Sequence, residues 1–155
     1  MPQKRPTAVV GQAARFIAMM TTEYDRTKHL ELLQSVISRM ASNSFALKGW
    51  SVTVTAALLG LAAKDSNPGF AIIALYPALA FWGLDAYYLH QERRFRALYD
   101  AVRDNAHVQP FAMDPAGFDA KVDTWFCTLT AGVVASIHLP ILSAIIGVLL
   151  YTFLT

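Results

Sequence analysis

The chain has 155 residues, of which 55% are hydrophobic and 15% charged, and its formal net charge is +2. Soluble domains average about 45–50% apolar and about 25% charged residues, and a domain of this length buries too little surface to hide the excess. The composition therefore argues against a soluble globular protein and predicts an all-α integral membrane protein. The small net charge gives no reason to expect direct nucleic-acid binding, and the single cysteine, Cys127, excludes an intrachain disulfide.

The first 20 residues contain an apolar run that follows two basic residues. Lys4 and Arg5 precede the run as they would in a secretory signal peptide, but Gln12 and Arg15 interrupt it and no clean small-residue cleavage site follows. We therefore interpret residues 1–20 as an amphipathic helix on the inner membrane face or as a loosely held tail.

Residues 21–106 are predicted to form a helical hairpin. Its first arm runs from Thr21 to Ser44, with Thr22 as the cap, and carries apolar side chains at helical spacing. No proline or glycine separates this arm from the start of a first membrane span over about 45–63. We expect one long helix that begins in the cytoplasm and continues through the membrane.

A tight turn joins the first span to a second one. Residues 64–69 contain Asn67-Pro68-Gly69, which is a strong turn signal. The second span covers about 70–89, which is the length needed to cross a bilayer. Its helix is expected to continue into a second cytoplasmic arm, and the two arms are expected to pack together as an antiparallel pair.

The remaining sequence predicts a cytoplasmic loop over 107–124 and a third span over 125–155. Pro110 and Pro115 mark the loop, and the Asp114-Pro115 pair is typical of the start of one short helix. The third apolar segment is longer than the roughly 20 residues that a crossing needs, so we expect it to tilt or kink.

Lysine and arginine residues indicate the orientation of these spans. Of the 13, all but Lys64 lie before or at the start of the first span, or between the second and third spans. The positive-inside rule then places the N-terminus and the 107–124 loop in the cytoplasm and the C-terminus outside.

A carboxylate and an imidazole lie within the predicted spans. A carboxylate inside a span is costly and often marks a functional site or a partner. Asp85 lies near the inner edge of the bilayer, where a structural pairing with Lys48 is an equally good explanation. His138 lies near the midplane, roughly 10 Å deeper at 1.5 Å per residue. We therefore expect it to bond a serine or threonine hydroxyl rather than Asp85, with a proton-relay or gating role as the alternative.

Small and hydroxyl residues recur four positions apart in the spans, a pattern that lets helices approach closely. The residues predicted to pack helices are Gly49, Thr53, Ala56, Gly60, Gly132, Ser136, Ser143 and Gly147. Ser51 and Thr55 add a polar edge to the first span. Because three spans leave much surface facing lipid, we expect a homo-oligomer in the bilayer.

The sequence contains no metal-ligand spacing, phosphate-binding glycine loop or nucleophile motif, so we expect no cofactor, metal or enzyme activity. Four charged residues of the second arm, Glu92, Arg93, Arg94 and Arg96, are expected to be exposed and to form a surface for a cytoplasmic partner.

The order of arm, span, Asn-Pro-Gly turn, span with Asp85 and basic arm from Gln91 resembles the SLATT-type family of small bacterial membrane effectors. The resemblance covers about residues 21–106. It implies an oligomeric pore in the bacterial inner membrane that acts in anti-phage defence and is controlled by a cytoplasmic protein or a nucleotide signal. The third span departs from the family's usual cytoplasmic tail.

Three functions stay open at this stage. The first is an oligomeric, pore-forming effector that is gated through its cytoplasmic helices. The second is a membrane anchor or accessory subunit that docks a partner protein. The third is a proton-linked membrane protein that uses Asp85 and His138.

Overall fold

The computed structural model describes residues 7–65, 67–104 and 108–154, and these residues contain helices and connecting segments but no strand. In chain order the elements are α1 (Thr7–Asp65), α2 (Pro68–Arg103), the 3₁₀ helix η1 (Ala116–Lys121), α3 (Trp125–Leu129) and α4 (Gly132–Leu154). In the described part of the chain α1, α2 and α4 are long and apolar enough to cross a membrane. The prediction of an all-helical chain with three such helices is confirmed.

The first helix is one continuous element of 59 residues. It includes the described part of the segment that was predicted to be a separate amphipathic helix or tail; residues 1–6 lie outside the described residues. The predicted cap at Thr22 is wrong, because its Oγ1 donates a hydrogen bond to the Ala18 carbonyl inside the helix. No proline occurs from Thr7 to Asp65, so nothing stops the helix before the hairpin turn.

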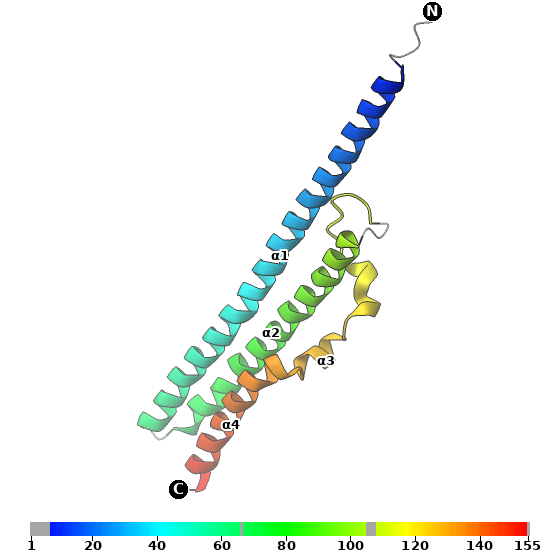
Figure 1. Ribbon diagram of the computed structural model, residues 1–155. Helices are drawn as coiled ribbons and strands as arrows, with labels where there is room; N and C mark the ends of the chain where they lie inside the picture. Colours follow the sequence, from blue (N-terminus) through cyan, green and yellow to red (C-terminus); the bar gives the residue numbers. More distant parts are fainter. Residues whose placement is uncertain (1–6, 66, 105–107, 155) are drawn as a thin grey trace, which may run out of the picture.

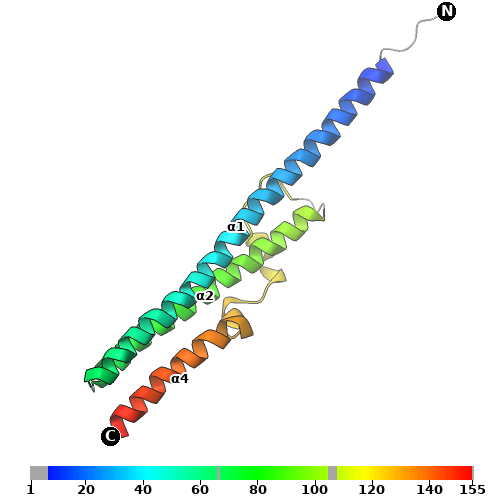
Figure 2. The ribbon, with the colours of Figure 1, turned by 60° about the vertical axis from the view of Figure 1, so that its left-hand side comes forward.

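The second helix begins where the turn signal predicted. Asn67 caps it, with its Oδ1 accepting a hydrogen bond from the Gly69 amide, and Pro68 takes the first helical position. α2 then runs unbroken past Pro77 to Arg103, so the second apolar stretch and the charged segment after it form one helix. Figures 1 and 2 both show α2 beside α1.

The end of α2 furthest from the turn packs against α1 and against the segment that leads into α3. We call the described residues 108–124 of this segment the connector. Leu33, Leu98 and Val102 are buried together there, with Val108 and Phe118 of the connector packed against them. Phe118 belongs to η1, whose position after Asp114-Pro115 confirms the predicted short helix.

The third apolar segment is divided, and the prediction of one helix from Trp125 is wrong. α3 ends at Leu129, Thr130 Oγ1 donates back to the Cys127 carbonyl, and α4 starts only at Gly132. At the division the Ala131 amide donates to the carbonyl of Thr128, three residues back, which is the tighter spacing of a turn. The helix that could cross the membrane therefore begins later than its apolar composition predicted.

The apolar halves of α2 and α4 meet in a compact cluster. Ala74 and Ala78 of α2 are buried with Ile141 and Ile145 of α4. Alanines on one helix leave room for branched side chains on the other, so the two backbones pack closely. The outer faces of these helices expose large apolar side chains such as Tyr76, as a lipid-facing surface does.

Candidate functional site

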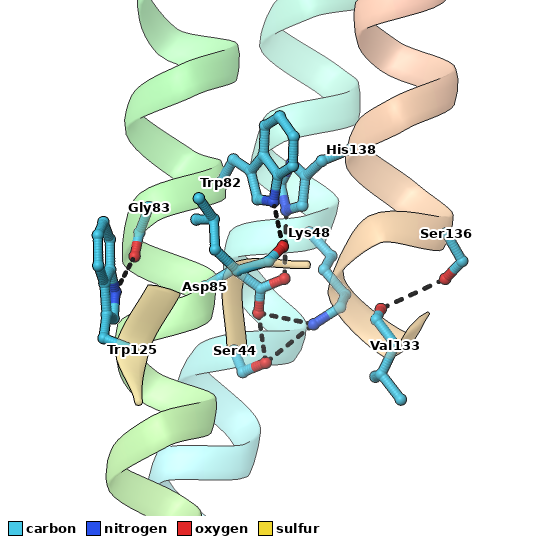
Figure 3. Close-up of polar contacts among 10 residues, drawn as sticks. Ser44, Lys48, Trp82, Gly83, Asp85, Trp125, Val133, Ser136 and His138 are labelled. Carbon is cyan, nitrogen blue, oxygen red and sulfur yellow. Dashed lines mark hydrogen bonds and ion pairs between the residues drawn. The ribbon is translucent and has the colours of Figure 1, made fainter. Parts of the chain in front are cut away.

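Four polar side chains from three helices meet inside the bundle and form what we call the polar centre: Ser44 and Lys48 of α1, Asp85 of α2 and His138 of α4 (Figure 3). Asp85 is fully buried and His138 is 1% exposed. Ser44 and Lys48 lie one helical turn apart, so both point toward the same place on α2.

The Asp85 carboxylate holds the polar centre together. Its Oδ1 accepts hydrogen bonds from Ser44 Oγ at 2.5 Å and Lys48 Nζ at 2.6 Å, and its Oδ2 lies 3.2 Å from His138 Nε2. Because a carboxylate oxygen accepts, Nε2 carries the hydrogen in this contact. Lys48 Nζ also donates to Ser44 Oγ. The pairing of Lys48 with Asp85 is confirmed, and one ammonium balances one carboxylate.

The contact between His138 and Asp85 corrects the prediction that they lie too far apart. That prediction measured the depth of His138 from Trp125, whereas α4 begins only at Gly132. His138 therefore lies less than two turns into its helix, at the level of Asp85. The predicted bond from His138 to a serine or threonine hydroxyl is also wrong, because its one hydrogen-bonded nitrogen contacts Asp85.

Tryptophans fix the position of α3 and α4 against α2. The Trp82 ring stacks on His138 with centroids 6.0 Å apart, and its Nε1 donates to the Leu129 carbonyl at 3.0 Å. Trp125 Nε1 donates in turn to the Gly83 carbonyl. Neither contact was predicted from the sequence. The spacing of Trp82 one turn before Asp85 is the signal that could have found the first one.

The buried polar atoms that lack a hydrogen-bond partner in the described residues include three in the part of the bundle around Lys48 and His138: Ser51 Oγ, Thr55 Oγ1 and His138 Nδ1. Ser51 and Thr55 follow Lys48 along the buried face of α1. Buried polar atoms are normally paired, and unpaired ones indicate strain, a functional role or a site for water. The polar face of α1 therefore extends from Ser44 to Thr55, deeper than the charged residues.

A groove opens beside the polar centre. Its volume is about 600 Å³, and its lining includes Ser44, Lys48, Glu92 and Ser136. The Lys48 side chain is 17% exposed, whereas Asp85 is 0% exposed. Lys48 thus lies between the fully buried carboxylate and the surface of the bundle.

The small residues predicted to pack helices do not pack within the chain. Gly49, Thr53, Ala56, Gly60, Gly132, Ser136, Ser143 and Gly147 are all exposed. A Cβ added at any of the four glycines would meet nothing within 4 Å. Alanines of α2 provide the close helix contacts instead, because they face α1 and α4.

The charged residues predicted to form a partner surface are largely used inside the chain. Arg93 pairs with Asp123 at 3.0 Å and Arg94 with Asp119 at 2.5 Å, so both bind the connector to α2. Glu92 is buried and pairs with Arg96 one turn later. Arg96, with its side chain 60% exposed, is the member of this set that fits the prediction best.

The connector is also bound to α1. His29 is 3% exposed, and its Nε2 donates to the Ala112 carbonyl at 2.8 Å while its ring lies 5.9 Å from that of Phe111. Phe111 has a φ of 59°, a left-handed conformation that is uncommon for a bulky residue. This strained turn brings the Ala112 carbonyl onto α1.

Outside the bundle interior, ion pairs raise the pKa values of two exposed groups. Glu31 raises the pKa of Lys28 through a hydrogen bond and its negative charge, and Asp104 does the same for Arg103. Both cations therefore remain charged at neutral pH.

No cluster of three or more histidine, cysteine, aspartate or glutamate side chains that could hold a metal ion occurs in residues 7–65, 67–104 and 108–154. No protein-family model, no curated protein sequence and no solved structure matches this chain.

Proposed function

We propose that the chain is a membrane effector whose polar centre acts as a latch that holds an ion path closed. In this proposal α1, α2 and α4 cross the bacterial inner membrane, with the N-terminus in the cytoplasm and the C-terminus outside. The unequal distribution of lysine and arginine supports this orientation. The extensions of α1 and α2 then form an antiparallel pair of arms in the cytoplasm.

One observation carries the proposal: the side chains of Lys48, Asp85 and His138 meet inside the bundle rather than facing lipid. Lys48 is followed along α1 by Ser51 and Thr55, which are 0% and 3% exposed. The groove opens beside Lys48, with Ser44, Glu92 and Ser136 in its otherwise apolar lining. Ionisable groups inside membrane bundles commonly mark paths for ions or protons.

Apolar side chains of α2 and α4 fill the remaining part of the bundle interior. Ala74, Ala78, Ile141 and Ile145 are buried there, and Leu58 packs against them. A hydrophobic constriction blocks ions by excluding water. Conduction therefore requires α4 to move away from α1 and α2, and the contact between His138 and Asp85 opposes that movement.

The connector offers a physical route from the cytoplasmic arms to this latch. It is bound to α1 through His29 and to α2 through Arg93 and Arg94. The same segment leads through α3 into α4, which carries His138. A cytoplasmic protein or nucleotide that displaced the connector would pull directly on α4, which agrees with gating through the arms.

Release of potassium from loaded liposomes containing the purified protein tests the proposal. Asp85→Asn weakens the bond to His138 by about 1.4 kcal/mol or more, so we expect at least about tenfold faster release than for the wild type. Asp65→Asn is the matched control, because Asp65 is exposed at the end of α1. It should leave release unchanged.

Other outcomes separate the competing functions. If liposomes with wild-type or Asp85→Asn protein are as tight as protein-free ones, the latch proposal fails and an anchor function gains support. If the wild type carries protons and Asp85→Asn abolishes that flux, Asp85 belongs to a proton path rather than to a latch. The defence role fails if expression with the neighbouring genes, during phage infection, changes neither growth nor membrane potential.

A further inference from the structure

The first part of α1 stands apart from the remaining helices. Figures 1 and 2 show it extending well beyond α2 and the connector. Its apolar side chains are exposed, including Val10 at 67%, Ile17 at 64%, Met20 at 55% and Tyr24 at 62%. A solitary helix segment with such a surface is marginal in water and calls for a partner.

Five of the exposed apolar side chains follow the spacing of a coiled coil, whereas Phe16 and Met19, which are also exposed, lie off it. Val10, Ala13, Ile17, Met20 and Tyr24 are separated by alternating steps of three and four residues, as are the core positions of a heptad repeat. At about 100° per residue they occupy an arc of about 80° along α1. We call this arc the back face of α1.

The back face points away from α2. The buried side of α1, which carries His29, Leu33 and Ile37, lies on the opposite side of the helix by the same helical rotation. The exposed stripe therefore does not continue the packing of α1 against α2. A partner of the back face must come from outside the chain.

The back face continues into the apolar part of α1 as a row of small residues. Gly49, Thr53, Ala56 and Gly60 lie on the same side of the helix and are all exposed. A Cβ at Gly49 or Gly60 would meet nothing within 4 Å. Small residues in this pattern allow two membrane helices to approach closely. The apolar stripe and the row of small residues therefore lie on one face of α1, and no other described part of the chain covers that face.

We propose that the back face of α1 binds the same face of a second copy, forming a parallel two-stranded coiled coil over residues 10–27. The parallel direction rests on the proposed membrane topology, because two copies inserted with the same orientation present α1 in the same direction. A two-fold axis along the membrane normal makes the contact isologous, so both copies use the same residues and neither leaves its back face exposed.

The charges that flank the stripe fit this direction. Glu23 precedes the core position Tyr24, and Lys28 follows the core position Thr27, so the two side chains flank the seam five residues apart. In a parallel coiled coil such residues face each other across the two chains. Within one chain Glu23 pairs with Arg26 and Lys28 pairs with Glu31, each three residues away. Replacing these ion pairs within one chain by pairs between the two chains costs little free energy, because surface ion pairs are weak.

The shape of α1 disfavours the membrane surface as the alternative occupant. α1 is one helix from Thr7 to Asp65 without an internal proline. The projecting segment therefore continues along the line of the span and leads away from the bilayer. A helix that lay on the membrane surface would need a sharp bend, which a continuous α-helix does not provide.

Two adjacent methionines provide a matched test. Met20 lies on the back face, whereas Met19 lies about 100° around the helix toward the α2 side and is 64% exposed. We expect wild-type and Met19→Glu protein to have the mass of a dimer, or of a multiple of it, in mild detergent. Met20→Glu should be mostly monomeric, because it places a like charge from each copy at the seam. A dimer mass or larger for all three proteins would refute the interface.

Cross-linking in membranes covers the case in which detergent separates the copies. In a Cys127→Ser background, Ile17→Cys should form disulfide-linked dimers on oxidation, whereas Ala18→Cys, which lies off the back face, should not. Equal cross-linking at both positions, or none at either, contradicts the proposal. Potassium release is measured independently, so a dimer that never leaks refutes the latch alone, and a leaking monomer refutes the dimer alone.

Discussion

Replacing Lys48 by Met removes the ammonium from the polar centre and leaves the Asp85 carboxylate with Ser44 and His138. Asp85 is 0% exposed, so its charge has no access to water. Breaking a buried ion pair by removing one partner typically costs about 3–5 kcal/mol, because the other charge stays buried. We expect Lys48→Met to lower the free energy of unfolding by about that amount.

The reverse substitution should cost less. Asp85→Asn leaves the ammonium of Lys48 without its carboxylate, but that side chain is 17% exposed and lies beside the groove. The ammonium can therefore turn toward water. We expect a loss of about 1–3 kcal/mol for Asp85→Asn, the range for a buried hydrogen-bonding group that loses charged partners. With both substitutions present, the cost should be close to that of Asp85→Asn alone.

Unfolding by sodium dodecyl sulfate in mild detergent, followed by tryptophan fluorescence, measures these differences. Trp82 reports directly, because its ring stacks on His138. Lys64→Met is the control, since Lys64 is exposed at the end of α1, and it should change stability by less than about 0.5 kcal/mol. Equal losses for the two single substitutions that add in the double variant would refute the account of a buried, coupled pair.

Three further predictions concern the supports of the polar centre and can be checked with the same unfolding assay or by limited proteolysis. Trp82→Phe removes the hydrogen bond to the Leu129 carbonyl and should cost about 1 kcal/mol, whereas an unchanged stability would mean that this bond does not hold α3. Asn67→Ala removes the cap of α2 and should also cost about 1 kcal/mol, against a smaller loss for Asn67→Ser. His29→Ala removes the bond to the Ala112 carbonyl, so trypsin should cut the connector faster, and an unchanged cleavage rate would show that other contacts hold it.

The features that follow from local chemistry could be predicted from the sequence. Apolar stretches of sufficient length located the three long helices, and the Asn-Pro-Gly turn located the start of α2. The pairing of Lys48 with Asp85 was predictable because both lie at a similar distance from the same hairpin turn. In each case the outcome follows from the composition of one stretch or from the distance of a residue to the hairpin turn.

The errors came from features that depend on competing local bonds or on the direction of a helix face. The turn between α3 and α4 does not show in the apolar composition, and missing it misplaced His138. The spacing of small residues was no error of this kind: it left open whether the partner helix belongs to the same chain, and within the chain these residues are exposed. The basic residues Arg93 and Arg94 contact a connector whose path no sequence pattern determines.

The measurement that tests the latch most directly combines Asp85→Asn with a removable lock on α4. Ala78 and Ile141 lie in the same buried cluster, so Ala78→Cys with Ile141→Cys, in a Cys127→Ser background, should join α2 to α4 on oxidation. We expect the potassium leak of the Asp85→Asn protein to stop when this disulfide forms and to return when it is reduced. A leak that persists after complete oxidation, or no leak in either state, would contradict the claim that the polar centre keeps α4 in its closed position.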